Sequence, residues 1–205
     1  MFVLSPNKIA NYLSKEAVIH SDINKKKRDQ IRYGLEWGIS GFYQILLTLL
    51  IGASLGVFFE TCLSLLVISS LRVFSGGAHF SKYNHCLIAS IILVVSIAAT
   101  SSYILTLIPN LHGVYYWTYP LFTLIILLYA PALFKKKDVM SKDRIKKVKI
   151  ISLFIAISFM TLSFLISSKY SIVIWQSLCY QIITLTPLGI KVIHFIDSSI
   201  NNRGK

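Results

Sequence analysis

Charged side chains are scarce in this sequence, and their scarcity excludes a large soluble domain. Only 14% of the 205 residues are charged, whereas a soluble domain carries about 25%. Hydrophobic residues make up 55%, and they fall in runs of roughly twenty, the length that crosses a hydrocarbon core of about 30 Å. The composition therefore predicts an all-α integral membrane protein, a single membrane domain over residues 1–205.

Paired cysteines are also missing, so a disulfide framework is not expected. The three cysteines, Cys62, Cys86 and Cys179, are an odd number and are widely spaced. Cys62 and Cys179 lie within apolar runs, where a thiol usually serves as a small buried hydrophobe. The N-terminus lacks the basic start and long apolar centre of a secretory signal, so we treat the whole chain as mature.

The sequence lacks the motifs of nucleotide and metal sites. Gly76 and Gly77 are not followed by the further glycine or the Gly-Lys-Ser/Thr of a phosphate-binding loop. His79, His85 and Cys86 are all zinc ligands by type, but no paired Cys-x-x-Cys or His-Glu-x-x-His spacing is present, and a fourth ligand would come from a distant residue such as His20 or His112. We predict no metal and no cofactor.

Acidic residues are few, which leaves the chain strongly basic. Lys and Arg number 21 against 8 Asp and Glu, a net charge of +13 that is concentrated at Lys25–Arg32 and Lys135–Lys149. Nucleic acid, anionic lipid and an acidic protein are competing partners for such charge. In a chain with many apolar runs, basic loops mark the cytoplasmic face. We therefore predict anionic membrane lipids, and no nucleic acid, beside these segments.

The apolar runs predict about six transmembrane helices. Residues 1–31 predict an N-terminal amphipathic helix on the bilayer, with a packed surface helix as the alternative. Placing both termini in the cytoplasm puts every strongly basic loop, including 135–149, on the cytoplasmic side. The second segment is short and only Glu60 separates it from the first, so it forms a tight hairpin or is re-entrant. The segments are Trp37–Phe59, Thr61–Phe74, Cys86–Ile108, Val114–Phe134, Ile150–Ile166 and Ile172–Ile196.

The polar stretch between the second and third segments, residues 72–86, reads RVFSGGAHFSKYNHC. A cysteine thiol is mostly protonated at neutral pH, and an imidazole, a positive charge or a helix N-terminus favours the reactive thiolate. On one continuous helix His79 and Cys86 would be about 10.5 Å apart along the axis. If Gly76 and Gly77 bend the chain and a helix begins near Ser81, His79 can fold back towards Cys86.

Non-helical backbone is therefore predicted around the glycines, and membrane depth tolerates it only where it is buried in protein or faces a water-filled cavity. His85 is the competing base. Neighbours on a helix project about 100° apart, so we favour His79 over His85 as the partner of Cys86. Polar interface histidines and a helix-start cysteine without a role are the alternative interpretation.

These residues resemble a known family. Arg72 at the end of an apolar segment, Gly76-Gly77-Ala78-His79, and Cys86 at the start of the next segment are similar to the AgrB membrane peptidases of Gram-positive quorum-sensing systems. Ser90 lies one helical turn beyond Cys86. Tyr33-Gly34-Leu35-Glu36 and the basic loop after Ala130-Pro131 match more loosely. In size, apolar segments and basic loops, the resemblance covers nearly the whole chain.

The resemblance implies a membrane cysteine endopeptidase that removes the C-terminal tail of a small precursor peptide at the cytoplasmic face and promotes closure of a thiolactone or lactone ring. Cys86 would be the nucleophile and His79 its general base. No third member that orients His79 is evident beyond backbone or Glu36. The alternative is a non-enzymatic transporter or assembly subunit whose residues 72–86 line a path.

The resemblance also suggests how the substrate is held. Arg72 binds a carboxylate of the precursor or anchors at lipid phosphate, and the amides of Gly76 and Gly77 are candidates for an oxyanion site. Family precursors carry acidic C-terminal tails, which Lys135, Lys136 and Lys137 would attract in a salt-dependent way. Both a monomer and a homodimer stay open.

Overall fold

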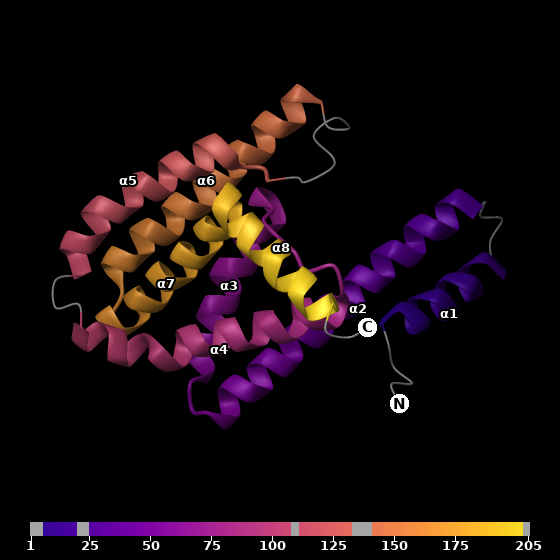
Figure 1. Cartoon of the computed structure of the whole chain (residues 1–205), viewed down its shortest axis with the longest axis horizontal. Helices are drawn as coiled ribbons and strands as arrows, with labels where there is room; N and C mark the ends of the chain where they lie inside the picture. Colours follow the sequence, from indigo (N-terminus) through magenta and orange to yellow (C-terminus); the bar gives the residue numbers. More distant parts are fainter. Residues whose placement is uncertain (1–5, 20–24, 108–110, 133–140, 203–205) are drawn as a thin grey trace. The chain divides into compact units, whose positions relative to one another are not determined.

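The chain is helical throughout its described parts. The computed structural model describes residues 6–19, 25–107, 111–132 and 141–202. Within these ranges there are eight helices and no strand, in agreement with the predicted all-α class (Figure 1). The helices are α1 (Pro6–Ile19), α2 (Lys25–Ser54), α3 (Phe58–Ser75), α4 (Tyr83–Leu107), α5 (Leu111–Tyr129), α6 (Lys142–Leu165), α7 (Ser168–Leu185) and α8 (Pro187–Asn202).

Two compact units divide the chain, residues 1–48 and 49–205. The first contains α1 and most of α2. Asn7 Nδ2 donates to Glu36 Oε1 at 3.0 Å, and Arg32 pairs with Glu36 Oε2 at 3.1 Å. The helix predicted within residues 1–31 is therefore present as α1, and the Asn7–Glu36 hydrogen bond joins it to α2.

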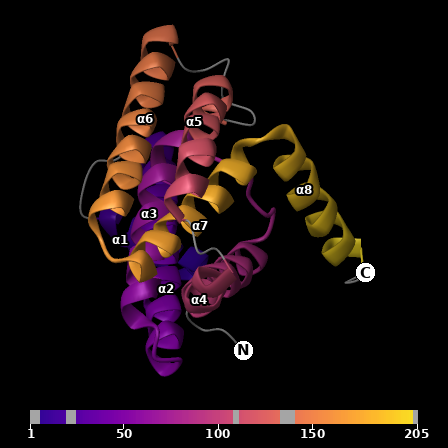
Figure 2. The ribbon, with the colours of Figure 1, turned by 90° about the vertical axis from the view of Figure 1, so that its left-hand side faces the viewer.

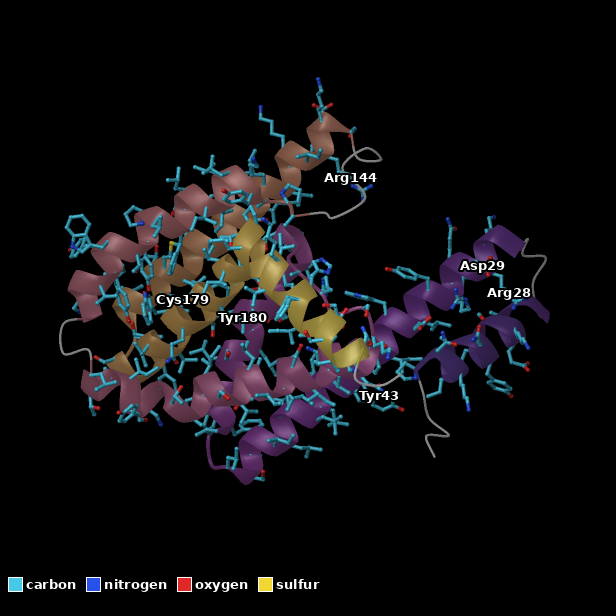
Figure 3. All side chains as sticks on the ribbon, in the orientation of Figure 1. Arg28, Asp29, Tyr43, Arg144, Cys179 and Tyr180 are labelled. Carbon is cyan, nitrogen blue, oxygen red and sulfur yellow. The ribbon has the colours of Figure 1, made fainter. Side chains whose placement is uncertain are left out.

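The second unit is organised around α7. This helix packs against α3, α4, α5, α6 and α8. Its buried apolar side chains contribute to two core clusters, one shared with α3, α5 and α6 and a smaller one shared with α3 and α4. Cys179 packs against the larger cluster and Tyr180 against the smaller, as their neighbouring positions on α7 allow (Figure 3). The interpretation of Cys179 as a small core residue is thus confirmed.

Four helices in the described ranges are long and apolar enough to cross a membrane, or five if the bent pair of α7 and α8 counts as one span. Large apolar side chains on them face outward, as lipid requires; Phe154 is 72% and Val73 62% exposed. The second segment, expected at Thr61–Phe74, is longer than predicted because α3 begins at Phe58 and ends at Ser75. α5 is not among the four, since Tyr, Trp, His and Pro lower the hydropathy of its first half.

A sharp bend separates α7 from α8. The two helices meet at 82° (Figure 2). Pro187 disfavours helical backbone at the residue before it, and Thr186 is accordingly extended, with φ −74° and ψ 150°. The Thr186 hydroxyl accepts a hydrogen bond from the Gly189 amide at 3.1 Å and so caps α8. The last expected segment, Ile172–Ile196, is therefore divided between two helices.

The basic stretch 135–149 is only partly a loop. From Lys142 onwards it forms the first turns of α6, and Ser141 Oγ caps that helix by accepting from the Arg144 amide at 3.4 Å. A capping serine followed by good helix formers explains why helix replaces loop here. Lys135, Lys136 and Lys137 lie outside the described residues.

Candidate functional site

The helix breaks where the glycines predict. α3 ends at Ser75 and α4 begins at Tyr83, and the backbone between them, the 76–82 loop, is not helical. Gly76 has φ 73° and Gly77 φ 140°, which other residues rarely adopt. A Cβ on Gly76 would lie 3.0 Å from the Ala132 oxygen, and one on Gly77 2.9 Å from Thr184 Oγ1. Both glycines are required by conformation and by space, and the expected bend is confirmed.

The start of this loop is docked on α7. Gln181, which is fully buried, donates through Nε2 to Ser75 Oγ at 3.0 Å and to the Gly76 oxygen at 2.8 Å. The Ala78 amide donates to the Thr184 oxygen at 3.2 Å. Gly77 and Ala78 are buried, so the non-helical backbone here lies inside the protein, which is where membrane depth tolerates it.

Arg72, in the last turn of α3, reaches back over the loop. Its Nη2 donates to the Ala78 carbonyl oxygen and lies 3.2 Å from His79 Nδ1. An arginine can only donate, so Nδ1 is the acceptor and the neutral imidazole carries its proton on Nε2. Although part of the His79 side chain is exposed, desolvation by the surrounding protein and then the charge of Arg72 lower the pKa of His79 to about 4. His79 is therefore neutral at pH 7.

Cys86 lies in the first turn of α4. Its amide donates to the Lys82 oxygen at 3.2 Å, its carbonyl accepts from Ser90 Oγ at 2.7 Å, and its thiol is free and half-buried. Among the described residues no hydrogen bond joins this thiol to His79. Catalytic hydrogen bonds are often formed only with substrate bound, so the separation does not decide the role of either residue.

Other residues proposed from the sequence have structural partners. Both carboxylate oxygens of Glu36 are engaged by Asn7 and Arg32 within the first unit. The Gly76 amide donates to the Arg72 oxygen at 3.1 Å, so in this conformation it closes the end of α3 and is not available to an oxyanion. Within the described parts of the chain, no three His, Cys, Asp or Glu side chains gather closely enough to hold a metal ion.

Two residues at this site were not identified from the sequence. Gln181 lies within the last expected apolar segment, Ile172–Ile196, and Asp197 directly follows that segment. Asp197 accepts from the Ser81 amide at 3.0 Å. A polar or charged residue within an apolar segment is a recognised signal of function. Only the fold reveals that both contact the loop, since more than a hundred residues separate them from it in sequence.

Similarity to known proteins extends over the helices that build this site. The family model described as Accessory gene regulator B matches residues 6–185, most of the chain and all of the site except α8. The chain belongs to the accessory gene regulator B family. Membership implies a membrane protein involved in accessory gene regulation and quorum sensing.

Individual family members are distant in sequence but similar in length. The accessory gene regulator protein B of Staphylococcus lugdunensis is 27% identical over 78% of this chain and 82% of its own length. That of Staphylococcus aureus (strain bovine RF122 / ET3-1) is 28% identical over 89% of this chain and 92% of its own. An AgrB-like protein of Clostridium perfringens (strain SM101 / Type A) is 25% identical over 94% and 97%. No solved structure is a significant match.

Proposed function

We propose that the protein is a membrane cysteine endopeptidase that removes the C-terminal tail of a small autoinducing-peptide precursor and promotes cyclisation of the remaining peptide. The single observation that carries the proposal is the placement of His79 and Cys86. Both lie at one break between two membrane helices, with His79 neutral and Cys86 a free thiol in the first turn of α4. A neutral imidazole and an accessible thiol are what nucleophilic catalysis by cysteine requires.

The reaction has two acyl transfers. The Cys86 thiol gives its proton to His79 and its sulfur attacks the scissile carbonyl carbon. The C–N bond then breaks, the tail leaves as an amine with the proton from His79, and a thioester remains on Cys86. A cysteine thiol of the precursor gives its proton to His79 and attacks this thioester, the bond to Cys86 sulfur breaks, His79 returns the proton to Cys86, and a thiolactone forms. A serine hydroxyl in the same role gives a lactone. Excluding water and holding the internal nucleophile close favour ring closure over hydrolysis.

Arg72 makes the activation of His79 as a base depend on the substrate. In the resting conformation Arg72 occupies Nδ1 of His79, and Nε2 already carries a proton, so the imidazole has no free acceptor for the thiol proton. A carboxylate on the precursor would draw the guanidinium away, because a charge-assisted pair with a carboxylate is stronger than a bond to a neutral imidazole. His79 then becomes a base only when an acidic substrate is present.

The membrane arrangement in this proposal has six crossings with both termini in the cytoplasm, and α5 is one of them. Nineteen residues of helix rise about 28 Å, close to the thickness of the hydrocarbon core. The 76–82 loop then lies at the cytoplasmic side. On that side the positive charge of Lys135, Lys136, Lys137 and the start of α6 would attract anionic lipid and the acidic tail.

Co-expression with a candidate precursor tests the proposal. The short peptide encoded beside the gene, if it has an internal cysteine and an acidic end, is the substrate to use, and mass spectrometry follows release of its tail. We expect cleavage with the unmodified protein and with Cys62→Ala, and none with Cys86→Ala or His79→Ala. Cleavage that survives both Cys86→Ala and His79→Ala, or that is lost in Cys62→Ala at normal membrane abundance, would overturn the proposal.

A further inference from the structure

Asp197 of α8 is a buried carboxylate that the proposed reaction does not use. Only 6% of the residue is exposed. Its Oδ2 accepts from the Ser81 amide at 3.0 Å, and its Oδ1 lies 3.5 Å from His85 Nδ1. Aspartate is rarely buried unless its charge is paired or hydrogen-bonded, because desolvating a charge is costly. Its two neighbours here, Ser81 and His85, both belong to the segment that carries His79 and Cys86.

The two contacts hold the segment on either side of the start of α4. Ser81 is two residues before the helix and two after His79, and His85 is the residue before Cys86. One turn further along α8, Asn201 Nδ2 donates to Ser81 Oγ at 3.1 Å. Side chains of α8 therefore contact the C-terminal half of the 76–82 loop, while Gln181 and Thr184 of α7 form hydrogen bonds with its beginning.

The two faces of α8 explain why Asp197 points inward. Leu188, Val192 and Phe195 are 75%, 56% and 72% exposed and, at 100° per residue, fall on one side of the helix. Asp197 lies roughly opposite them on the helical wheel. An apolar face that remains outside the protein core suits lipid, and it turns the carboxylate towards the loop.

We propose that Asp197 is a positioning residue for the reaction. It fixes the start of α4 and orients His85, so that Cys86 keeps its place relative to His79 when the precursor binds. His85 Nδ1 and Asp197 Oδ1, 3.5 Å apart, form no hydrogen bond in this conformation, and neither atom has another partner among the described residues. Since the carboxylate can only accept, a small rotation of the imidazole would let Nδ1 donate to it and so orient the side chain next to the nucleophile. The inference rests on the proposed function, and it concerns a helix that lies beyond the matched residues 6–185.

The test compares Asp197→Ala and Asp197→Asn with Ser198→Ala in cleavage of the precursor by the full-length protein in membranes. Asparagine retains an acceptor for the Ser81 amide but loses the charge that faces His85. Ser198 is the next residue on α8 and is exposed. Its hydroxyl donates to the Phe195 oxygen of its own helix at 2.8 Å and to no loop residue among those described, so it is a matched control.

We expect Asp197→Ala to lower kcat by between about tenfold and a hundredfold, with KM changed less, Asp197→Asn to be intermediate, and Ser198→Ala to match the unmodified protein. We also expect hydrogen exchange at residues 81–86 to speed up in Asp197→Ala alone. If the Asp197→Ala protein does not insert into the membrane, the kcat of Asp197→Asn provides the test. Unchanged kcat in both Asp197 variants, or a loss that only follows protein abundance, would overturn the inference. If Cys86→Ala still cleaves, the proposed function fails instead.

Discussion

Arg72 and His79 are the residue pair on which the chemistry of the site depends. The pKa of His79, at about 4, lies below the ordinary value of 6.5 because desolvation and then the Arg72 charge disfavour the imidazolium. The unfolded chain therefore binds this proton more readily than the folded chain. Both residues could be placed at the site from the sequence, but their contact could not, because the bend at the glycines brings Arg72 and the imidazole together.

Replacing Arg72 with Gln should raise the pKa of His79 from about 4 part of the way towards its ordinary value of 6.5, since desolvation, the larger cause, stays and the Arg72 charge is removed. Carbon-13 NMR of histidine-labelled protein, assigned with His79→Gln, measures the titration. In the unmodified protein, stability contributed by His79 is complete above about pH 6.5 and is lost as the pH falls towards 4. A His79 pKa near 6.5 without the substitution, or no change with it, would contradict this account of the pair.

Gly77 is expected to tolerate no side chain. Its φ is 140° and a Cβ there would lie 2.9 Å from Thr184 Oγ1, so Gly77→Ala should lower the free energy of unfolding by about 1–3 kcal/mol. Gly34→Ala is the control, because Gly34 is within α2 and nothing lies within 4 Å of the place a Cβ would take. Alanine there should be neutral or stabilise the helix by up to about 1 kcal/mol. Thermal unfolding in detergent compares them, and equal effects would contradict the assigned role of Gly77.

At the scale of elements, α7 is the scaffold of the loop. The apolar run that contains α7 was evident from the sequence, although the expected segment Ile172–Ile196 continued past the end of α7 at Leu185. The sequence did not show that α7 is central or that Gln181 lies against the glycines. Helical periodicity does not say which neighbour a polar side chain contacts. The boundaries of α3 and α6 were also missed by several residues, since local helix propensity and a serine cap extend them.

Gln181→Leu should destabilise the protein by about 1–3 kcal/mol, because the Gly76 oxygen and the Ser75 hydroxyl lose a buried donor. Gln176→Leu is the matched control on the same helix. Among the described residues its Oε1, like that of Gln181, is buried without a hydrogen-bond partner, but Gln176 does not make the hydrogen bonds to Ser75 and Gly76 that Gln181 makes, so leucine there should cost nothing or stabilise. Chemical unfolding in detergent gives both values. A Gln176 variant that is the less stable of the two would contradict this account of the scaffold.

At the scale of the whole molecule, α5 decides the topology. If α5 crosses the membrane, the start of α6 is cytoplasmic and the start of α7 is outside; if it does not, these sides are exchanged. A membrane-impermeant maleimide should therefore label Ser168→Cys in intact cells and Lys142→Cys only after permeabilisation, with the unsubstituted protein as background. The reverse pattern would show that the chain has fewer than six crossings. The sequence predicted the crossings from its apolar runs and their direction from the positions of its basic loops.

The central claim is that Cys86 forms a thioester with the precursor, and trapping that acyl-enzyme tests it most directly. A precursor whose internal cysteine is replaced by alanine cannot close its ring, so the thioester should accumulate. Mass spectrometry of the intact protein should then show an added mass equal to the precursor without its tail, located on Cys86 and absent from Cys86→Ala. An adduct on another residue, or tail release by Cys86→Ala, would contradict the account.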